Sequence, residues 1–373
     1  MDSPPGHLGG RGRMTDPDAG EPGPAPPVLE MGLEAPGRCG RLVHASTGER
    51  LSRREDDKLE YMNLENGSKI RFQAQFVSVS ILFPTPSPST TRGGSLMSQS
   101  DLKSPTLDWP SSYRDLVNRN LGLLTEREQE RLRRARVAIC GLGGLGGIVA
   151  EVLARTGVEL FRLLDNGTFE ATNSNRQIYS FTDTSGLLKT DVTEGFLKRI
   201  NPNVMTEKYL EASEANVSRF LEDVDVVVLA LDAVLPILLL SREACRRKIP
   251  LVEGWALAYG NVRVITEKTP SLEELYGFPT IGRKVSSVTA EEVIRLGHKQ
   301  VVDTIGSMKG LSAYYPESVL TRLQEKGEGT TFAPFVWLTS VMMALEVCKV
   351  LLGWGEVALA PQYTVYDGLR RHG

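Results

Sequence analysis

Residues 137–147 read VAICGLGGLGG, a short apolar run that passes directly into a glycine-rich turn. The run predicts a strand buried on both faces, and a helical pattern follows the glycines. Gly141, Gly143 and Gly146 have the spacing G-x-G-x-x-G, with Gly144 between them. Such glycines permit a tight turn and let backbone N–H groups approach a phosphate at the helix N-terminus. This stretch therefore predicts an α/β domain that binds a nucleotide.

The alternation of apolar strands with helices continues to about residue 268. Further strands are predicted at 161–165, 204–209, 225–231, 249–254 and 261–267, and helices at about 144–156, 185–200, 213–222 and before Lys248. Strands that are apolar throughout and separated by helices predict right-handed crossovers between parallel neighbours. We therefore expect an α/β fold with a doubly wound, mostly parallel sheet and helices on both faces.

The rest of this domain, which we place at 111–373, is less regular. Residues 269–332 are polar and contain several glycines, which indicates an insertion or crossover segment. Residues 333–353 form the most apolar helical pattern, and Gly353 is placed to end it. A closing strand is predicted at 363–369.

The first 110 residues differ in composition, because they hold 13 of the 21 prolines. Tracts rich in Pro, Gly and Ser bury little surface, so we expect a largely disordered, low-complexity extension. Within it, residues 59–83 resemble a hairpin that turns at Asn66-Gly67. Met97 also opens a segment typical of a natural start. Residues 1–96 are then either a native leader or an over-extended gene prediction.

Charge and cysteine content exclude several classes of protein. A net charge of −3 gives no electrostatic argument for wrapping nucleic acid. Glu346 and Lys349 interrupt the most apolar helix, so we expect no membrane contact, and the N-terminus lacks a secretory signal. Four scattered cysteines without a CxxC pair exclude a disulfide framework and a four-cysteine zinc site. We expect a cytoplasmic protein whose Cys140, Cys245 and Cys348 are buried.

Polar residues follow the strand predicted at 161–165. Asp165 lies at its end, 24 residues after Gly141, where an acceptor for a ribose hydroxyl belongs. The loop that follows contains Asn173, Arg176 and Gln177. The glycine turn and Asp165 alone suit NAD or FAD as well as ATP. An arginine aimed at the phosphates favours phosphoryl or adenylyl transfer over hydride transfer, because charge then grows on the phosphate oxygens.

Two more residues complete a candidate site. Lys189, at the start of the next helix, supplies a second cation, and Asp232 follows the strand at 225–231. A carboxylate there is placed to hold Mg²⁺ against the phosphates. Each residue alone is also typical of a solvated surface charge. Together they favour attack of a carboxylate on the α-phosphate of ATP.

With these residues in place, the chain resembles the ThiF/MoeB/HesA superfamily of ubiquitin-activating-like adenylyltransferases. The resemblance covers residues 113–268 and continues more weakly to about 368. The shared features are Arg119 with Gln129, GLGGLGG at 141–147, Asp165, TNSNRQ at 172–177, Lys189, INPNV at 200–204, Asp232 and IPLV at 249–252.

The resemblance implies a role for each matching residue. The glycine loop and Asp165 would hold ATP, and the asparagine, arginine and lysine named above would contact phosphates. Asp232 would handle Mg²⁺. Arg119, before the first strand, matches an arginine that reaches the triphosphate bound by the partner subunit, which implies a homodimer. The NxNRQ loop is also similar to the branch of tRNA threonylcarbamoyl-adenosine dehydratases.

Several positions depart from the family pattern. Gly167 replaces the second carboxylate of the usual Asp-x-Asp, and Ala233 replaces the asparagine that usually follows the metal aspartate. Residues 270–335 contain no cysteine that would form a thioester. Cys348 lies in the apolar helix, where a thiolate is disfavoured.

The leading hypothesis is an Mg·ATP-dependent adenylyltransferase that activates the C-terminus of a small ubiquitin-like protein or peptide, with direct attack on the adenylate. Two alternatives stay open. One is a dehydratase that acts on a tRNA-borne carboxylate, and the other is a non-catalytic scaffold that only binds a nucleotide.

Overall fold

The computed structural model describes residues 59–63, 69–73, 107–326 and 329–370. The chain divides into two compact units, residues 1–94 and 95–373. In the first unit, β1 (Leu59–Asn63) pairs antiparallel with β2 (Lys69–Gln73), with Asn63 opposite Lys69. The Asn66-Gly67 turn predicted between them, and the extension predicted around them, lie outside the described residues.

The second unit is built on a seven-stranded sheet in the described part of the chain. Its strands are β3 (Arg136–Cys140), β4 (Leu160–Leu164), β5 (Met205–Tyr209), β6 (Val226–Leu229), β7 (Leu251–Glu253), β8 (Gly260–Ile265) and β9 (Thr364–Tyr366). Their order across the sheet is β5-β4-β3-β6-β7-β8-β9. The first five are parallel, β8 is antiparallel to β7, and β9 is antiparallel to β8. The predicted α/β, mostly parallel sheet is confirmed.

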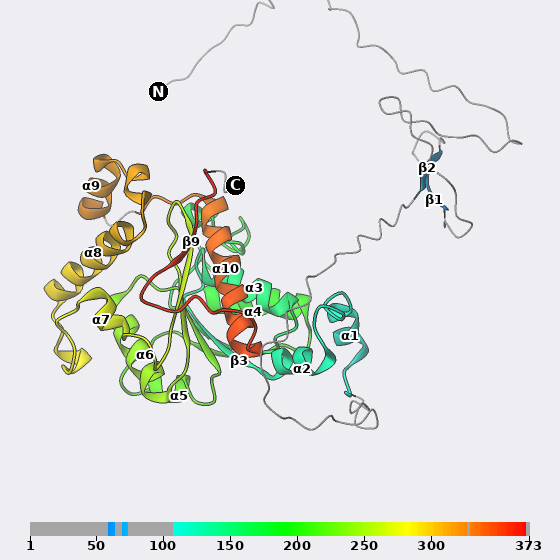
Figure 1. The fold of residues 1–373 in the computed structure, drawn as a ribbon, viewed down its shortest axis with the longest axis horizontal. Helices are drawn as coiled ribbons and strands as arrows, with labels where there is room; N and C mark the ends of the chain where they lie inside the picture. Colours follow the sequence, from blue (N-terminus) through cyan, green and yellow to red (C-terminus); the bar gives the residue numbers. More distant parts are fainter. Residues whose placement is uncertain (1–58, 64–68, 74–106, 327–328, 371–373) are drawn as a thin grey trace, which may run out of the picture. The chain divides into compact units, whose positions relative to one another are not determined.

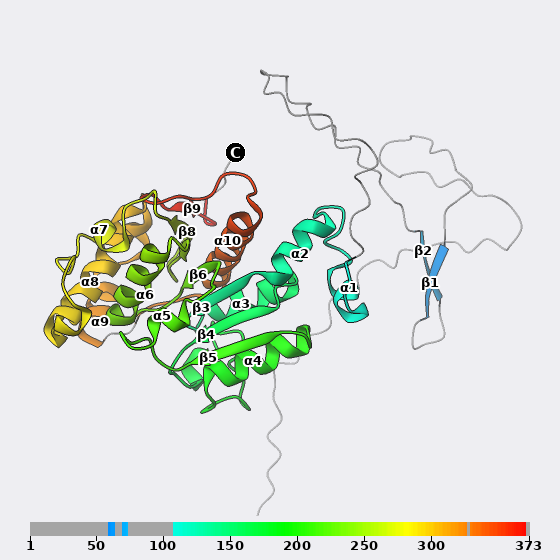
Figure 2. The same cartoon turned by 90° about the horizontal axis from the view of Figure 1, so that it is seen from below.

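Helices cover both faces of this sheet (Figure 1, Figure 2). The described helices are α1 (Ser111–Val117), α2 (Glu126–Arg134), α3 (Gly146–Arg155), α4 (Lys189–Ile200), α5 (Val217–Phe220), α6 (Val234–Arg247), α7 (Leu272–Tyr276), α8 (Ala290–Ser307), α9 (Glu317–Lys326) and α10 (Ala333–Leu352). One apolar core joins the sheet to α2, α3, α4 and α10, and a second joins it to α5, α6, α7 and α8. Val137 and Ile139 lie in the first core, and Ala138 and Cys140 in the second. The central strand is thus buried on both faces, as predicted.

The helix α10 lies across the first face and packs on β8 and α3 (Figure 1). It ends at Gly353, whose φ of +70° confirms the predicted stop. Its buried Glu346 accepts hydrogen bonds from Lys349 Nζ and from Ala358 N, at 2.5 and 2.9 Å. By length and composition α10 is apolar enough to cross a membrane, and 44% of its apolar window is buried in this fold.

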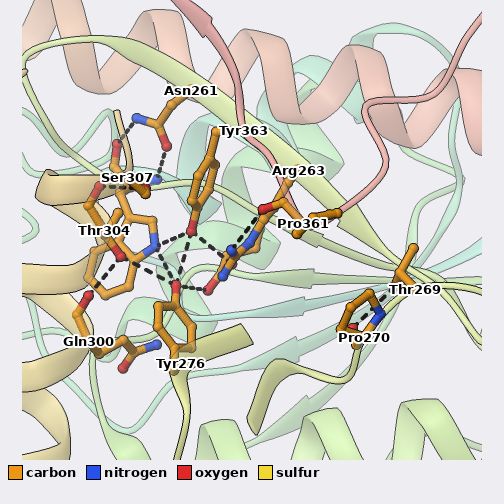
Figure 3. Close-up of polar contacts among 12 residues, drawn as sticks. Asn261, Arg263, Thr269, Pro270, Tyr276, Gln300, Thr304, Ser307, Pro361 and Tyr363 are labelled. Carbon is orange, nitrogen blue, oxygen red and sulfur yellow. Dashed lines mark hydrogen bonds and ion pairs between the residues drawn. The ribbon is translucent and has the colours of Figure 1, made fainter. Parts of the chain in front are cut away.

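A buried polar cluster ties the segment 269–332 to the carboxyl end of β7 (Figure 3). Glu253 accepts hydrogen bonds from Arg263 Nε at 2.6 Å, Tyr276 Oη at 2.8 Å and Tyr363 Oη at 3.0 Å. The Arg263 guanidinium lies 4.9 and 4.3 Å from the centres of the two tyrosine rings. Trp255 Nε1 donates to both phenol oxygens. Two elements distant in sequence, α7 and the C-terminal segment, are thereby fixed to one strand end.

Candidate active site

The glycine turn after β3 is dictated by close backbone contact. Gly141 has a φ of +92°, and a Cβ there would lie 2.3 Å from the carbonyl oxygen of Ala230, just after β6. A Cβ on Gly146 would lie 1.8 Å from the carbonyl oxygen of Gly141. Only glycine fits these two positions, so the turn folds tightly against the end of β6.

The same turn opens the helix α3 without a side-chain cap. The first N–H groups of a helix have no intrahelical partner, and the helix dipole adds partial positive charge there. Gly143 and Gly144 are half-buried, and hypothetical Cβ atoms on them would lie 3.6 Å from Gln177 Nε2 and 3.5 Å from Arg176 Cγ. The loop at 172–177 therefore lies against the turn, as the sequence predicts for a phosphate site.

Asp165 joins the glycine turn to the end of β4. Its Oδ2 accepts a hydrogen bond from Leu142 N and its Oδ1 accepts one from Gly167 N, both at 2.7 Å. This structural role was missed by the sequence interpretation, which assigned the carboxylate to a ribose hydroxyl. A carboxylate has about four acceptor sites, so these two bonds leave capacity for a ligand hydroxyl.

The loop that carries Arg176 is held by its own polar groups. Asn173 is buried and accepts a hydrogen bond from Glu170 N at 3.2 Å. Arg176 Nη1 donates to Thr172 O at 3.0 Å and to Asn175 Oδ1 at 2.8 Å. Trp337 Nε1, near the start of α10, donates to Arg176 O at 3.0 Å. The Arg176 guanidinium is thus hydrogen-bonded to its own loop. It must give up these hydrogen bonds to contact a phosphate.

Gln177 gives a direct sign of a missing partner at this turn. Its side chain is 7% exposed, and its Oε1 is buried without a hydrogen bond among the described residues. A buried acceptor without a donor costs about 1–3 kcal/mol, so such atoms are rare unless a ligand or water satisfies them. The unpaired Oε1 therefore fits a ligand that carries a hydroxyl or another donor, while Nε2 of the same side chain is the atom that faces the Gly143 Cβ position, at 3.6 Å.

Lys189 begins α4 and lies over the turn after β4. Its Nζ is 3.2 Å from where a Cβ of Gly167 would be, and 6.0 Å from the centre of the Phe169 ring. Within the described part of the chain it forms no ion pair. Gly167 has no side chain to bind the half-buried ammonium, and Asp165 Oδ1, which lies 3.1 Å from the same Cβ position, is not paired with it, so Lys189 is available to a phosphate.

Asp232 lies on the third strand end that meets this turn. Ala230 N donates to Cys140 O at 2.8 Å, which holds the end of β6 beside the glycine turn, and Asp232 follows two residues later with its side chain exposed. No group of three or more His, Cys, Asp or Glu side chains is arranged for a metal among the described residues. Mg²⁺ is commonly held by one or two carboxylates together with substrate phosphates, so Asp232 fits a site that a nucleotide would complete.

Arg119 is not brought to this site within the chain. It is exposed in the turn after α1, and the neighbouring Asn120 Nδ2 donates to Thr156 O at 3.3 Å, beyond the C-terminus of α3. The glycine turn opens the other end of α3, which at 1.5 Å per residue is about 15 Å away. The trans role that the resemblance gives to Arg119 stays a prediction.

The family of this chain is identified by comparison of its sequence with models of known protein families. The model described as ThiF family matches residues 117–372. The chain belongs to the ThiF family.

Curated proteins are similar in sequence to part of this chain. A tRNA threonylcarbamoyladenosine dehydratase of Bacillus subtilis (strain 168) is 34% identical over 131 residues, covering 35% of this chain and 52% of the relative. A molybdopterin-synthase adenylyltransferase of Escherichia coli (strain K12) is 27% identical over 243 residues, covering 65% and 82%. The chain spans about half the length of several curated relatives, including the dehydratase.

Solved structures are similar to part of the chain. The E. coli tRNA N6-threonylcarbamoyladenosine dehydratase in complex with AMP has a TM-score of 0.46 at 21% identity, covering 65% of this chain and 97% of that chain. E. coli MccB with ATP has a TM-score of 0.43 at 21% identity, covering 61% and 60%.

Among the described thiols of this ThiF-family protein, Cys140 directly precedes the glycine turn but is fully buried, and Cys348 is half-buried on α10. Burial raises the pKa of Cys140 far above its usual value and that of Cys348 to about 11. The prediction that Cys245 is buried is wrong, since it is exposed near the C-terminus of α6 and borders a cavity of about 300 Å³. It lies about 16 Å along α6 from the helix start beside Asp232.

Proposed function

We propose that this ThiF-family protein uses Mg·ATP to adenylylate the C-terminal carboxylate of a small ubiquitin-like protein or peptide. ATP-dependent adenylation of a carboxylate is the activity of the family, and the finer substrate is the proposal. The observation that carries it is that the ends of β3, β4 and β6 meet at the glycine turn; Arg176, Lys189 and Asp232 come from segments that follow β4 and β6.

The site residues suit a displacement at the α-phosphate. An oxygen of the substrate carboxylate attacks the α-phosphorus, the bond to the oxygen bridging toward the β-phosphate breaks, and pyrophosphate leaves with the electron pair. Negative charge grows on the phosphate oxygens during this step, and Lys189 and Arg176 are the cations placed to stabilise it. Uncapped N–H groups of α3 add fixed donors. Asp232 would hold Mg²⁺, which supplies further charge neutralisation.

A protein or peptide substrate is supported by the name of one relative. The relative that is matched over 82% of its length is named for adenylylation of molybdopterin synthase, which is a protein. A separate observation concerns the acceptor: burial raises the pKa of Cys140, the thiol next to the turn, far above its usual value, and that of the half-buried Cys348 to about 11. We therefore propose that the acceptor attacks the adenylate directly, without a thioester on this chain.

A tRNA substrate is the second candidate, because the relative at 34% identity is named a tRNA threonylcarbamoyladenosine dehydratase. That function predicts ATP turnover stimulated by tRNA. A non-catalytic nucleotide-binding role, suggested by Gly167 and Ala233, instead predicts ATP binding without turnover.

The test follows oxygen from the substrate to the product. Candidate proteins and peptides with ¹⁸O-labelled C-terminal carboxylates are incubated with ATP, Mg²⁺ and the full chain. Adenylylation followed by attack at the acyl carbon leaves one ¹⁸O atom in AMP, which mass spectrometry detects. Label in AMP with a peptide substrate supports the proposal, and label only when a tRNA carboxylate is supplied supports the dehydratase. Unlabelled ADP and phosphate would contradict both.

A further inference from the structure

Trp337 joins the first turns of α10 to the loop that carries Arg176. Its Nε1 donates a hydrogen bond to the carbonyl oxygen of Arg176 at 3.0 Å, across 161 residues of the chain. Within the part of the chain that the structure describes, this carbonyl accepts no other hydrogen bond. The indole ring is 44% exposed and is not part of the apolar core beneath α10. A single side chain of α10 therefore sets the orientation of this carbonyl.

The peptide between Arg176 and Gln177 is held from both sides. Its carbonyl accepts the bond from Trp337, and its N–H, on Gln177, donates to Asn173 O at 2.9 Å. The C=O and N–H of a trans peptide point in opposite directions, so the two bonds together fix the tilt of the peptide plane. The bond to Asn173 is local, whereas the bond from Trp337 comes from another element. This peptide carries both side chains of the loop that lie against the glycine turn.

The backbone that carries Trp337 is fixed on the glycine turn. Val336, the preceding residue, is fully buried, and its Cγ1 lies 2.9 Å from where a Cβ of Gly144 would be. The Cγ of Arg176 lies 3.5 Å from the same position. Gly144 thus meets both the start of α10 and the stem of the arginine. The indole therefore reaches Arg176 from a backbone that is packed on the same turn.

Arg176 needs a fixed peptide because its guanidinium has to move. Its Nη1 donates to Thr172 O and Asn175 Oδ1, and these bonds are given up when the guanidinium contacts a phosphate. The side chain has several rotatable bonds, so the guanidinium can move while the peptide stays in place. A peptide that is already fixed lowers the entropy cost of ordering the side chain on a ligand.

We propose that Trp337 is a positioning residue, whose hydrogen bond fixes the Arg176 peptide so that the guanidinium reaches a phosphate of the nucleotide. Trp337 contacts neither nucleotide nor substrate in this role and acts only through Arg176. The inference rests on the proposed function in one respect, which is that Arg176 contacts the phosphates. Loss of one neutral hydrogen bond should weaken binding by about three- to tenfold.

A double-mutant cycle on ATP affinity tests the proposal in the full chain. Calorimetric titration with ATP and Mg²⁺ compares the parent, Trp337→Phe, Arg176→Ala and the double variant. Trp337→Phe keeps an aromatic ring without the donor, so affinity for ATP should fall about three- to tenfold. Affinity for adenosine, which has no phosphate, should stay the same. In the Arg176→Ala background, Trp337→Phe should change ATP affinity by less than about twofold, because no guanidinium remains to be positioned.

Trp354→Phe is the matched control, because Trp354 Nε1 donates to Glu128 Oε1 at 2.8 Å just beyond the other end of α10. It should leave affinity for ATP unchanged. Unchanged ATP affinity in Trp337→Phe, an equal loss for ATP and adenosine, or the same loss in the Arg176→Ala background would overturn the proposal. The proposed function fails separately, if the parent chain binds ATP but exchanges no pyrophosphate with any carboxylate. The cycle then still decides the role of Trp337.

Discussion

Two groups of polar side chains lie along the same edge of one sheet and are paired very differently. At the ends of β7 and β8, the carboxylate of Glu253 takes three donors, and its partner Arg263 is enclosed by two rings. At the ends of β4 and β6, Lys189 and Asp232 have no ion pair among the described residues, and Gln177 Oε1 has no donor.

We interpret this contrast as the difference between a structural cluster and the proposed binding site. A charge that is fully paired inside the fold has little left to offer a ligand, whereas an unpaired one is stabilised when the ligand arrives. The cluster at β7 keeps one unpaired nitrogen, Arg263 Nη2, but the two tyrosine rings flank that guanidinium. We therefore expect substitutions in the two groups to separate stability from activity.

The largest effect is expected from Arg263→Ala in the cluster. Removing one partner of a buried ion pair leaves Glu253 uncompensated, which costs about 3–5 kcal/mol of the free energy of unfolding. Urea denaturation measures this loss, while affinity for ATP should be unchanged below the unfolding transition. The control, Arg155→Ala, breaks an exposed pair with Glu151 and should cost about 0.3–0.5 kcal/mol. A loss under 1 kcal/mol in Arg263→Ala would show that the cluster around Glu253 does not stabilise the fold.

Lys189→Ala should have the opposite profile. Removal of a preorganised charge that stabilises the transition state lowers turnover by about 10²- to 10³-fold. Formation of AMP measures the loss, and urea denaturation should show no destabilisation because the ammonium has no ion pair to lose. Lys198→Ala, on the same helix and paired with Glu194, is the matched control and should keep full turnover.

Asp232→Asn should change the dependence on Mg²⁺. Loss of one carboxylate ligand weakens a charge-assisted contact of about 1.5–3 kcal/mol, so half-maximal activity should need about tenfold or more Mg²⁺. A titration of turnover against Mg²⁺ at saturating ATP tests this. An unchanged Mg²⁺ requirement would show that Asp232 does not bind the metal.

The smallest effect is expected from Gln177→Leu. ATP affinity should fall about tenfold, as expected for one lost hydrogen bond of about 1.4 kcal/mol. Stability of the free protein should stay constant or rise, because an unsatisfied buried acceptor is removed. Calorimetric titration with ATP and urea denaturation measure the two quantities. A destabilised variant with unchanged affinity would show that Gln177 is only structural.

The sequence predicts the fold around the glycine turn far better than the cluster around Glu253. Strong local signals, such as the apolar run at 137–140 before the glycines, determine one strand, one turn and one helix. Arg176, Lys189 and Asp232 could be placed because each follows such a strand or begins such a helix. Gly353 could be placed as a helix stop for the same local reason.

The cluster around Glu253 has no local signal, because its members come from β7, β8, α7 and the C-terminal segment. Glu253 and Arg263 lie on two short strands, and nothing in the sequence indicates that they pair. Their ion pair depends on the antiparallel pairing of β8 with β7, which places Arg263 opposite Glu253. The exposure of Cys245 was missed for a related reason. Apolar neighbours on α6 predict a buried helix, and only the packing shows which side faces outward.

We propose that the turn after β3 activates ATP at its α-phosphate. Exchange of labelled pyrophosphate into ATP, with Mg²⁺ and a panel of candidate carboxylate substrates, tests that claim most directly. We predict substrate-dependent exchange in the parent chain, its loss in Arg176→Ala and Lys189→Ala, and its retention in Lys198→Ala. Normal exchange in both Arg176→Ala and Lys189→Ala, or no exchange although ATP binds, would contradict it.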